Sequence, residues 1–146
     1  MPRADFVCVA RLRVRWAEVD MQKIVFNGHY LTYIDTAFAD YVRAIGLPYP
    51  DGYVERYGSD IYLRKATLEY LGSARYDDEL EVCCRVAKLG RSSMTFRFEI
   101  YRRVEALISA EMVYVNANPS TMEAAPLPED LRARILRYER VAPSTA

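Results

Sequence analysis

The polar residues best placed to do chemistry lie between Asp20 and His29. Asp20 follows a segment that alternates like a strand, and Asn27, Gly28 and His29 stand where a helical pattern begins. A helix start exposes unpaired backbone N–H groups and about half a unit of positive charge, which suits an oxyanion forming at a carbonyl carbon. A nearby carboxylate can activate water or attack directly. From these residues alone, however, an ordinary turn or helix-cap aspartate is the favoured interpretation.

Other routes to catalysis have little support in the sequence. His29 is the only histidine, and no serine or cysteine is near it in the sequence, so a Ser–His–Asp or Cys–His site is not favoured. Metal sites usually draw on several histidine or cysteine ligands, and no phosphate-binding glycine loop or GxGxxG pattern occurs. We therefore expect no metal and no separate cofactor. The acidic run from Asp77 to Glu79 falls in a turn signal and is interpreted as a solvated loop.

The composition indicates one globular domain over residues 1–146, with a hydrophobic content of 51% that supports a packed core. Twenty basic and twenty acidic residues cancel, which argues against a general nucleic-acid binder. Cys8, Cys83 and Cys84 lack metal-ligand spacing and are interpreted as free thiols of a cytoplasmic protein. We expect no signal peptide and no membrane partner, because no apolar stretch approaches the roughly 20 residues of a membrane helix.

The hydrophobic pattern predicts the elements that must position Asp20. Residues 6–16 alternate between apolar and charged side chains, which predicts a half-buried strand with Trp16 on its inner face. Residues 28–45 follow helical spacing with a wide apolar face, and Gly46 marks the end of this helix. Residues 49–58 are rich in turn signals, and a short helical turn is expected within them. Four further strands and a terminal helix are predicted at about 60–72, 79–89, 93–103, 106–117 and 129–139.

One strand, a long helix and four successive strands favour an antiparallel sheet. A helix this apolar requires a sheet that curves around it. The expected fold is therefore α+β, of β-α-β-β-β-β order with a short C-terminal helix. Both faces of the segment ALISAEMVYV, residues 106–115, carry apolar side chains, so we expect a second subunit to cover the outer face of the sheet.

The stretch VRWAEVDMQKIVFNGHYLTYIDTAF, residues 14–38, resembles the signature of the hotdog-fold acyl-CoA thioesterases, specifically the 4-hydroxybenzoyl-CoA thioesterase family. In that signature a strand, an aspartate, a short apolar run and a polar residue precede the tyrosine that opens a long helix. ATLEYLGSARYDDELEV at residues 66–82 and LGRSS at residues 89–93 extend the similarity, which covers roughly residues 8–118.

The resemblance implies hydrolysis of an acyl-CoA or acyl-carrier thioester by a homodimer or homotetramer, with coenzyme A as part of the substrate. It places the catalytic carboxylate at Asp20. The amides that hold the thioester carbonyl fall on three residues: Asn27, Gly28 and His29. The turn that contacts the pantetheine or nucleotide part of coenzyme A falls on four residues: Gly90, Arg91, Ser92 and Ser93. Arg91 is the best candidate for a phosphate contact.

The sequence departs from the family pattern at two positions. Lys23 stands where the family often has glycine, and Asn27 stands where some members have histidine. His29 is therefore interpreted as a polar residue of the first helical turn rather than an essential base. Glu18 and Asp20 would raise each other's pKa if their side chains pointed the same way. Two alternatives stay open: a hotdog protein that binds acyl-CoA without hydrolysing it, and a hotdog dehydratase.

Overall fold

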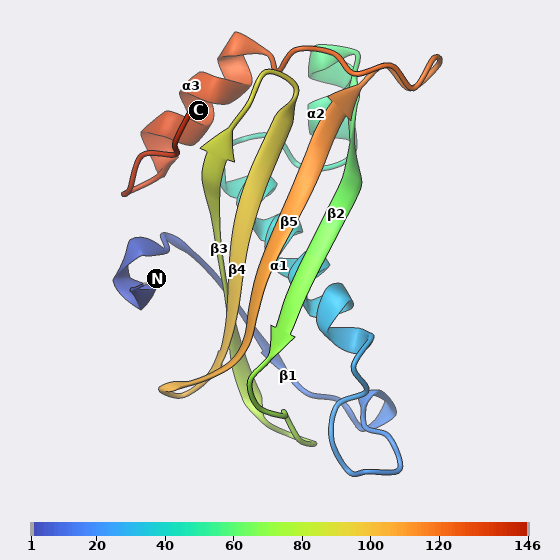
Figure 1. Ribbon diagram of the computed structural model, residues 1–146, viewed down its shortest axis with the longest axis vertical. Coiled ribbons are helices and arrows are strands. Elements are labelled where there is room, and N and C mark those ends of the chain that lie inside the picture. Colours follow the sequence, from blue (N-terminus) through green and yellow to red (C-terminus); the bar gives the residue numbers. More distant parts are fainter. Residues whose placement is uncertain (1, 146) are drawn as a thin grey trace.

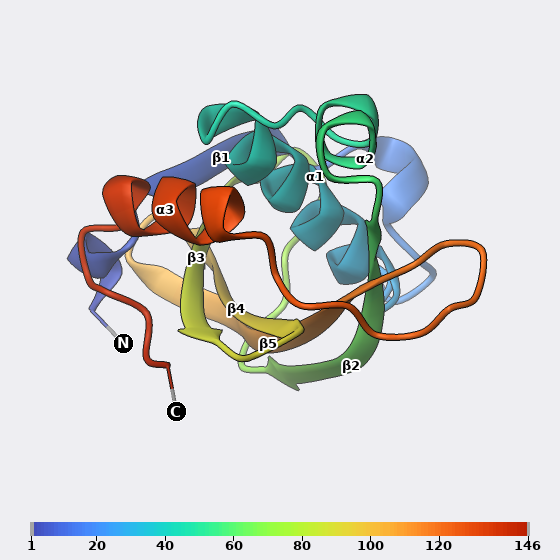
Figure 2. The ribbon, with the colours of Figure 1, turned by 90° about the horizontal axis from the view of Figure 1, so that it is seen from above.

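The computed structural model describes residues 2–145; Met1 and Ala146, the end residues of the predicted single domain, lie outside the described residues. One antiparallel sheet has the strand order β1-β3-β4-β5-β2. It curves around the long helix α1, and α2 and α3 lie near one end of it (Figure 1 and Figure 2). The elements are β1 (Cys8–Arg13), α1 (His29–Ala44), α2 (Asp51–Tyr57), β2 (Asp60–Tyr70), β3 (Glu79–Leu89), β4 (Ser93–Arg102), β5 (Glu105–Ala117) and α3 (Glu129–Tyr138). The predicted α+β class and element order are confirmed.

The helix α1 fills the concave face of the sheet because its apolar side chains recur at helical spacing. Tyr30, Ile34 and Tyr41 are almost fully buried on this face. The helix stops where Gly46 takes a φ of 85°, a left-handed conformation that costs glycine little. None of the helices in residues 2–145 is long and apolar enough to span a bilayer. This packing fixes the start of α1 at His29 relative to the sheet.

The strand register sets the distance between the two ends of the sheet. Ser93 of β4 lies opposite Val115 of β5, and Tyr70 of β2 lies opposite Ile108 of β5. Val115 and Ile108 are seven residues apart, which corresponds to about 23 Å at roughly 3.3 Å per residue. The turn between β3 and β4 and the C-terminal end of β2 therefore lie at opposite ends of the sheet (Figure 1).

The ends of the chain cover part of the outer face of the sheet. The guanidinium of Arg3 lies over the Tyr101 ring, 4.4 Å from its centroid. The amide of Ser144 donates to the Ala87 carbonyl at 2.9 Å, so the C-terminal segment pairs with β3 beyond Cys8, the first residue of β1. Cys83, on this outer face, is fully buried, and all three cysteines are free thiols. Part of the cover that we expected from a second subunit thus comes from the chain itself.

The first strand is shorter than predicted. It ends at Arg13, and a short 3-10 helix, η2 (Trp16–Glu18), follows. Trp16 is 84% exposed, so its predicted position on the inner face is wrong. The cause is local: the Glu18 carboxylate accepts the Arg15 amide at 2.8 Å and also the Arg15 guanidinium, which turns the chain out of the strand.

Candidate active site

Asp20 lies in a tight loop that returns the chain from η2 to α1. Its amide donates to the Ile24 carbonyl at 3.0 Å, and its carbonyl accepts the Lys23 amide at 2.9 Å. Lys23 has a φ of 66°, in the left-handed region that glycine adopts without a steric cost. The lysine that departs from the family pattern therefore occupies a conformation that a glycine would take more easily.

The carboxylate of Asp20 has one oxygen engaged and one open. Oδ1 accepts the Gln22 amide at 2.8 Å, which caps the turn. For Oδ2, residues 2–145 supply no hydrogen-bond donor and no ion pair. The side chain is half-buried and lines a cleft of about 350 Å³. Asp20 is thus a turn residue whose second carboxylate oxygen is available to a ligand.

The cleft lies between the Asp20 loop, the start of α1 and the end of β2, and its walls are joined by tyrosine hydroxyls. The Tyr70 hydroxyl donates to the Asn27 carbonyl at 3.2 Å. The Ala74 amide donates to the Tyr30 hydroxyl at 3.0 Å. Burial raises the pKa of Tyr30, so this phenol stays protonated at neutral pH. These bonds hold the helix start and the chain after β2 around the space that Asp20 faces.

The start of α1 leaves backbone donors available. Within residues 2–145, no side chain caps this end of the helix. The His29 amide donates to the Phe26 carbonyl at 3.0 Å and so already has an acceptor. The amides of Asn27 and Gly28 donate to no acceptor in the described part of the chain. Of the three predicted amides, those of Asn27 and Gly28 therefore have no acceptor within residues 2–145, and Asn27 also lines the cleft.

The side chain of His29 does not line the cleft. Its ring packs edge-on against Phe26, with 5.8 Å between ring centroids. Asn27 does line the cleft, together with Asp20. The tertiary structure thus places Asn27, rather than the conspicuous histidine, in the same cavity as the carboxylate.

Glu18 is buried beside this cleft but has other partners. Its carboxylate accepts the Tyr33 hydroxyl at 2.9 Å and the Arg15 guanidinium at 3.0 Å. Burial alone would raise the pKa of Glu18, but the hydrogen bonds from Arg15 and Tyr33 outweigh it and lower the pKa. The condition for Glu18 and Asp20 to raise each other's pKa is therefore not met, because the carboxylate of Glu18 is held by these two donors.

The turn at residues 90–93 lies at the other end of the sheet from Asp20 (Figure 1). Hydrogen bonds within the chain hold its backbone; the Leu127 amide, for example, donates to the Arg91 carbonyl at 2.8 Å. The side chain of Arg91 is exposed. One chain therefore does not bring the predicted coenzyme A turn to the Asp20 cleft.

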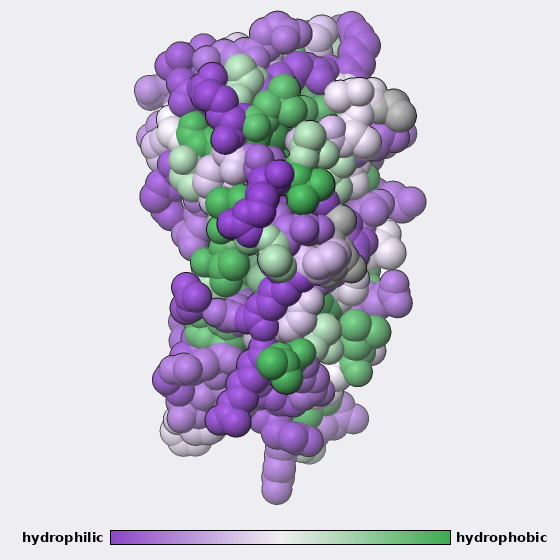
Figure 3. All heavy atoms as spheres, turned by 90° about the vertical axis from the view of Figure 1, so that its left-hand side faces the viewer, coloured by the Kyte–Doolittle hydropathy of each residue, from purple (hydrophilic) through white to green (hydrophobic). Residues whose placement is uncertain are grey.

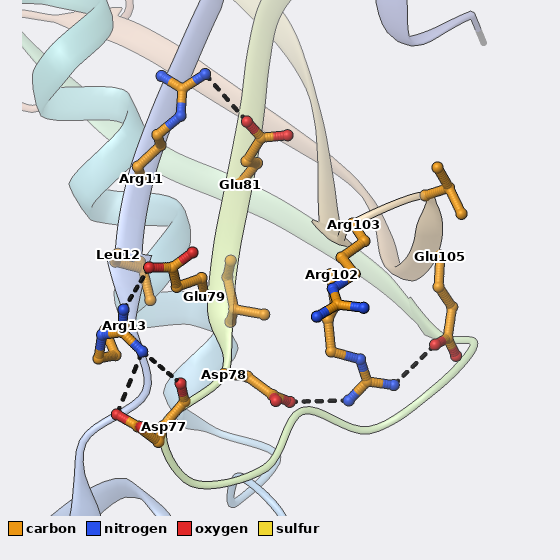
Figure 4. Close-up of a pocket in the computed structure, with 12 residues that line it drawn as sticks. Arg11, Leu12, Arg13, Asp77, Asp78, Glu79, Glu81, Arg102, Arg103 and Glu105 are labelled. Carbon is orange, nitrogen blue, oxygen red and sulfur yellow. Dashed lines mark hydrogen bonds and ion pairs between the residues drawn. The ribbon is translucent and has the colours of Figure 1, made fainter.

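A larger hollow of about 1070 Å³ lies where β1, β3 and the turn between β4 and β5 meet (Figure 4). Arginines hold its carboxylates: Arg13 pairs with Asp77 at 3.4 Å, and Arg102 pairs with Asp78 at 2.8 Å. Arg102 also pairs with Glu105 at 2.7 Å. The acidic run predicted as a solvated loop is largely exposed at Asp77 and Glu79, and its carboxylates also form ion pairs with arginines. These opposite charges neutralise one another, whereas Asp20 keeps an open oxygen, so the smaller cleft is the candidate site.

Comparison with known proteins identifies the family. The model of the thioesterase superfamily matches residues 22–109, more than half of the chain. This chain belongs to the thioesterase superfamily. The thioesterase is 30% identical to a putative esterase of Aquifex aeolicus over 102 residues, which are 70% of this chain and 78% of that protein. It is 26% identical to the acyl-CoA thioester hydrolase YbgC of Escherichia coli over 123 residues, 84% of this chain and 90% of that one.

Solved structures share the fold of this thioesterase. A thioesterase-superfamily protein from Jannaschia sp. CCS1 superposes with a TM-score of 0.86 and 20% identity, over 97% of this chain and 99% of that one. The hypothetical protein TT1821 from Thermus thermophilus superposes with a TM-score of 0.81 and 27% identity, over 90% of this chain and 99% of that one. The predicted hotdog fold and thioesterase family are confirmed. Because the family match begins at Gln22, the case for Asp20 depends on the geometry of the cleft.

Proposed function

We propose that this chain hydrolyses acyl-CoA thioesters and that Asp20 is the general base or the nucleophile. The observation that carries the proposal is the open Oδ2 of Asp20 in a cleft that also contains the start of α1. Membership of the thioesterase superfamily and the similarity to an acyl-CoA thioester hydrolase support this reaction class.

The geometry suggests how the reaction proceeds. A thioester carbonyl oxygen bound by the amides of Asn27 and Gly28 is polarised by these N–H donors and by the positive end of the α1 dipole. Asp20 then takes a proton from an attacking water, or attacks the carbonyl carbon to form a mixed anhydride that water hydrolyses. In both routes the C–S bond breaks, and the products are a free acid and a thiol.

We infer that two chains pair through β2. This strand has 11 residues and forms an edge of the sheet. An exposed edge of this length presents unpaired N–H and C=O groups, which a second copy can satisfy. Leu63 on β2 and Leu71 just after it are 52% and 57% exposed. On the face around β3 and α3, by contrast, hydrophilic side chains separate small hydrophobic areas (Figure 3).

Such pairing supports a site built from both chains. Two β2 strands that pair antiparallel about a two-fold axis bring the Asp60 end of one beside the Tyr70 end of the other. The turn at residues 90–93 lies at the Asp60 end of the sheet, because Ser93 and Asp60 pair with neighbouring positions of β5. The second copy therefore presents its Arg91 at the end of the double sheet where Asp20 lies. We assign the contact with the phosphates of coenzyme A to this arginine.

The outer face of β2 and β5, which the chain ends leave open, is the surface on which two dimers would form a homotetramer; Thr67 and Glu111 there are exposed. A cytoplasmic location is consistent with three buried free thiols.

Binding of acyl-CoA without hydrolysis is the second candidate function. One observation favours it: Oδ1 of Asp20 caps the Gln22 amide, a structural role that needs no catalysis. A dehydratase has weaker support, because such enzymes rely on a histidine and His29 does not line the cleft.

The test compares wild type, Asp20→Asn and Asp77→Asn on acetyl-CoA, octanoyl-CoA, benzoyl-CoA and an acyl-carrier thioester, with released thiol detected by a thiol-reactive dye. Asp77 is a suitable control because it is an exposed turn carboxylate at the same end of the sheet, with a φ of 70° that asparagine tolerates. We expect Asp20→Asn to lower kcat by about 100-fold or more, with an unchanged circular dichroism spectrum. Near wild-type turnover by this variant contradicts the assignment. Binding without thiol release by wild type favours the second candidate.

A further inference from the structure

The buried carboxylate of Glu18 joins Arg15, two residues after the end of β1, to Tyr33 of α1 without lining the cleft. Its side chain is 7% exposed. Oε1 accepts the Arg15 amide at 2.8 Å and the Tyr33 hydroxyl at 2.9 Å. Oε2 accepts Nε and Nη2 of Arg15 at 3.1 and 3.0 Å. Four donors fill the roughly four lone-pair sites of a carboxylate, so none is left to take a proton from a substrate or a water.

The backbone of Glu18 closes the loop that carries Asp20. The carbonyl of Glu18 accepts the Phe26 amide at 3.0 Å. The next residues inward, Val19 and Val25, form an isolated antiparallel bridge. Glu18 and Phe26 are thus the two ends of the loop. Any shift of Glu18 moves the whole loop, and with it the Asp20 carboxylate.

Tyr33 is the residue of α1 that is hydrogen-bonded to Glu18. It lies one turn after the helix start and is 3% exposed. Burial and the neighbouring Glu18 carboxylate raise the pKa of Tyr33, so its hydroxyl stays a donor at neutral pH. Its ring packs edge-on against Tyr30, which lines the cleft, with 5.8 Å between centroids. Glu18 is therefore bonded to both parts that the reaction must hold together: its carboxylate to Tyr33 of α1, and its backbone carbonyl to Phe26 at the end of the Asp20 loop.

We propose that Glu18 is a positioning residue that sets the Asp20 carboxylate relative to the amides at the start of α1. This role presupposes that the Asp20 cleft is the thioesterase site. Hydrolysis needs the carboxylate and the amides on either side of one carbonyl group, and a displacement of about 1 Å can cost roughly 100-fold in rate. Glu18 touches no reacting atom, so its loss lowers kcat rather than substrate affinity.

The experiment measures kcat and KM of Glu18→Gln, Tyr33→Phe and the double variant on the most active acyl-CoA of the panel. We expect Glu18→Gln to lower kcat by about 10- to 100-fold, with KM within about threefold of wild type. Tyr33→Phe removes a single hydroxyl and should have a smaller effect of the same kind. The kcat of the double variant should be no lower than that of Glu18→Gln, because both substitutions act on the same hydrogen bond between Tyr33 and Glu18. Glu79→Gln is the matched control: Glu79 also pairs with an arginine, Arg13, but its side chain is 75% exposed.

Asp20→Asn, measured in parallel, separates the two levels of the proposal. Retained turnover in Asp20→Asn overturns the proposed site and the role of Glu18 with it. Loss of turnover in Asp20→Asn with wild-type kcat in Glu18→Gln overturns the role of Glu18 alone, as does a raised KM with unchanged kcat. If Glu18→Gln does not fold, the kcat of Tyr33→Phe tests the proposal instead. An unchanged kcat in folded Tyr33→Phe contradicts the proposal.

Discussion

The amide of Lys23 donates to the carbonyl of Asp20 at 2.9 Å while Lys23 itself holds a φ of 66°. The candidate catalytic carboxylate is therefore held by a turn in which a lysine adopts a conformation suited to glycine. Backbone hydrogen bonds, rather than the lysine side chain, keep this turn closed. The shape of the loop is thus sensitive to the backbone preference at position 23.

Substitution of Lys23 tests this relationship. Lys23→Gly relieves a steric cost of about 1 kcal/mol but adds a similar entropy to the unfolded chain, so we expect its unfolding free energy within about 1 kcal/mol of wild type and its kcat unchanged. Lys23→Val places a β-branched residue at positive φ. This variant should have a lower kcat and an unfolding free energy that is lower by about 1–2 kcal/mol. Urea denaturation and thiol release measure the two effects. Equal stability of the glycine and valine variants contradicts the prediction.

Arg91 is expected to act on substrate binding only. Loss of one exposed phosphate contact is worth about 1 kcal/mol, so Arg91→Ala should raise KM for acyl-CoA about fivefold and leave kcat unchanged. The matching acyl-pantetheine, which lacks the nucleotide, should be hydrolysed equally by both proteins. Arg137→Ala, at another exposed arginine on the terminal helix α3, is the control. An unchanged KM for acyl-CoA removes Arg91 from the binding site.

The β2 edge is expected to carry the dimer. Burying a leucine contributes about 1.5–3 kcal/mol, so replacing both Leu63 and Leu71 with lysine should weaken dimerisation at least about tenfold. Sedimentation velocity over a concentration series gives the dissociation constant, and activity should fall with the dimer fraction. Val104→Lys is the control, because Val104 is 92% exposed on the turn between β4 and β5. A wild-type chain that is monomeric and fully active refutes the two-chain site.

Tyr41 is expected to stabilise the fold in a pH-dependent manner. Its hydroxyl donates to Oε2 of buried Glu139 at 2.7 Å, where α3 meets α1. Burial raises the pKa of Glu139, and the hydrogen bonds from Tyr41 and the Val86 amide lower it. Tyr41→Phe removes one of these donors, so the pKa of Glu139 rises further. A carboxyl with a raised folded pKa loses stability as pH rises, because the ionised form is the disfavoured one.

The free energy of unfolding of Tyr41→Phe should therefore fall by about 1.5–3 kcal/mol, and the loss should be larger at pH 8 than at pH 5. Guanidinium denaturation at the two pH values measures it. Tyr57→Phe is the matched control, because Tyr57 donates at 2.8 Å to the exposed carboxylate of Asp130, and its loss should cost less. A loss that is equal at both pH values, or larger at pH 5, contradicts the account.

The sequence by itself determined the kinds and order of the elements. Strand and helix periods differ, so alternation in residues 79–89 and helical spacing in residues 28–45 are visible without any tertiary contact. Gly46 ends the helix for a local reason, its freedom to take a positive φ. Family resemblance favoured a catalytic role for Asp20 over that of an ordinary turn residue, and it added the turn at residues 90–93 as a candidate.

Only the tertiary structure decided how those candidates relate in space. It placed Asn27 in the cleft and His29 against Phe26, and it directed Glu18 to Tyr33. It also separated the turn at residues 90–93 from Asp20 by the length of the sheet. The physical reason is that these outcomes depend on how loops, helix and sheet pack and hydrogen-bond in three dimensions, whereas a local pattern records only which face of its own element a side chain occupies.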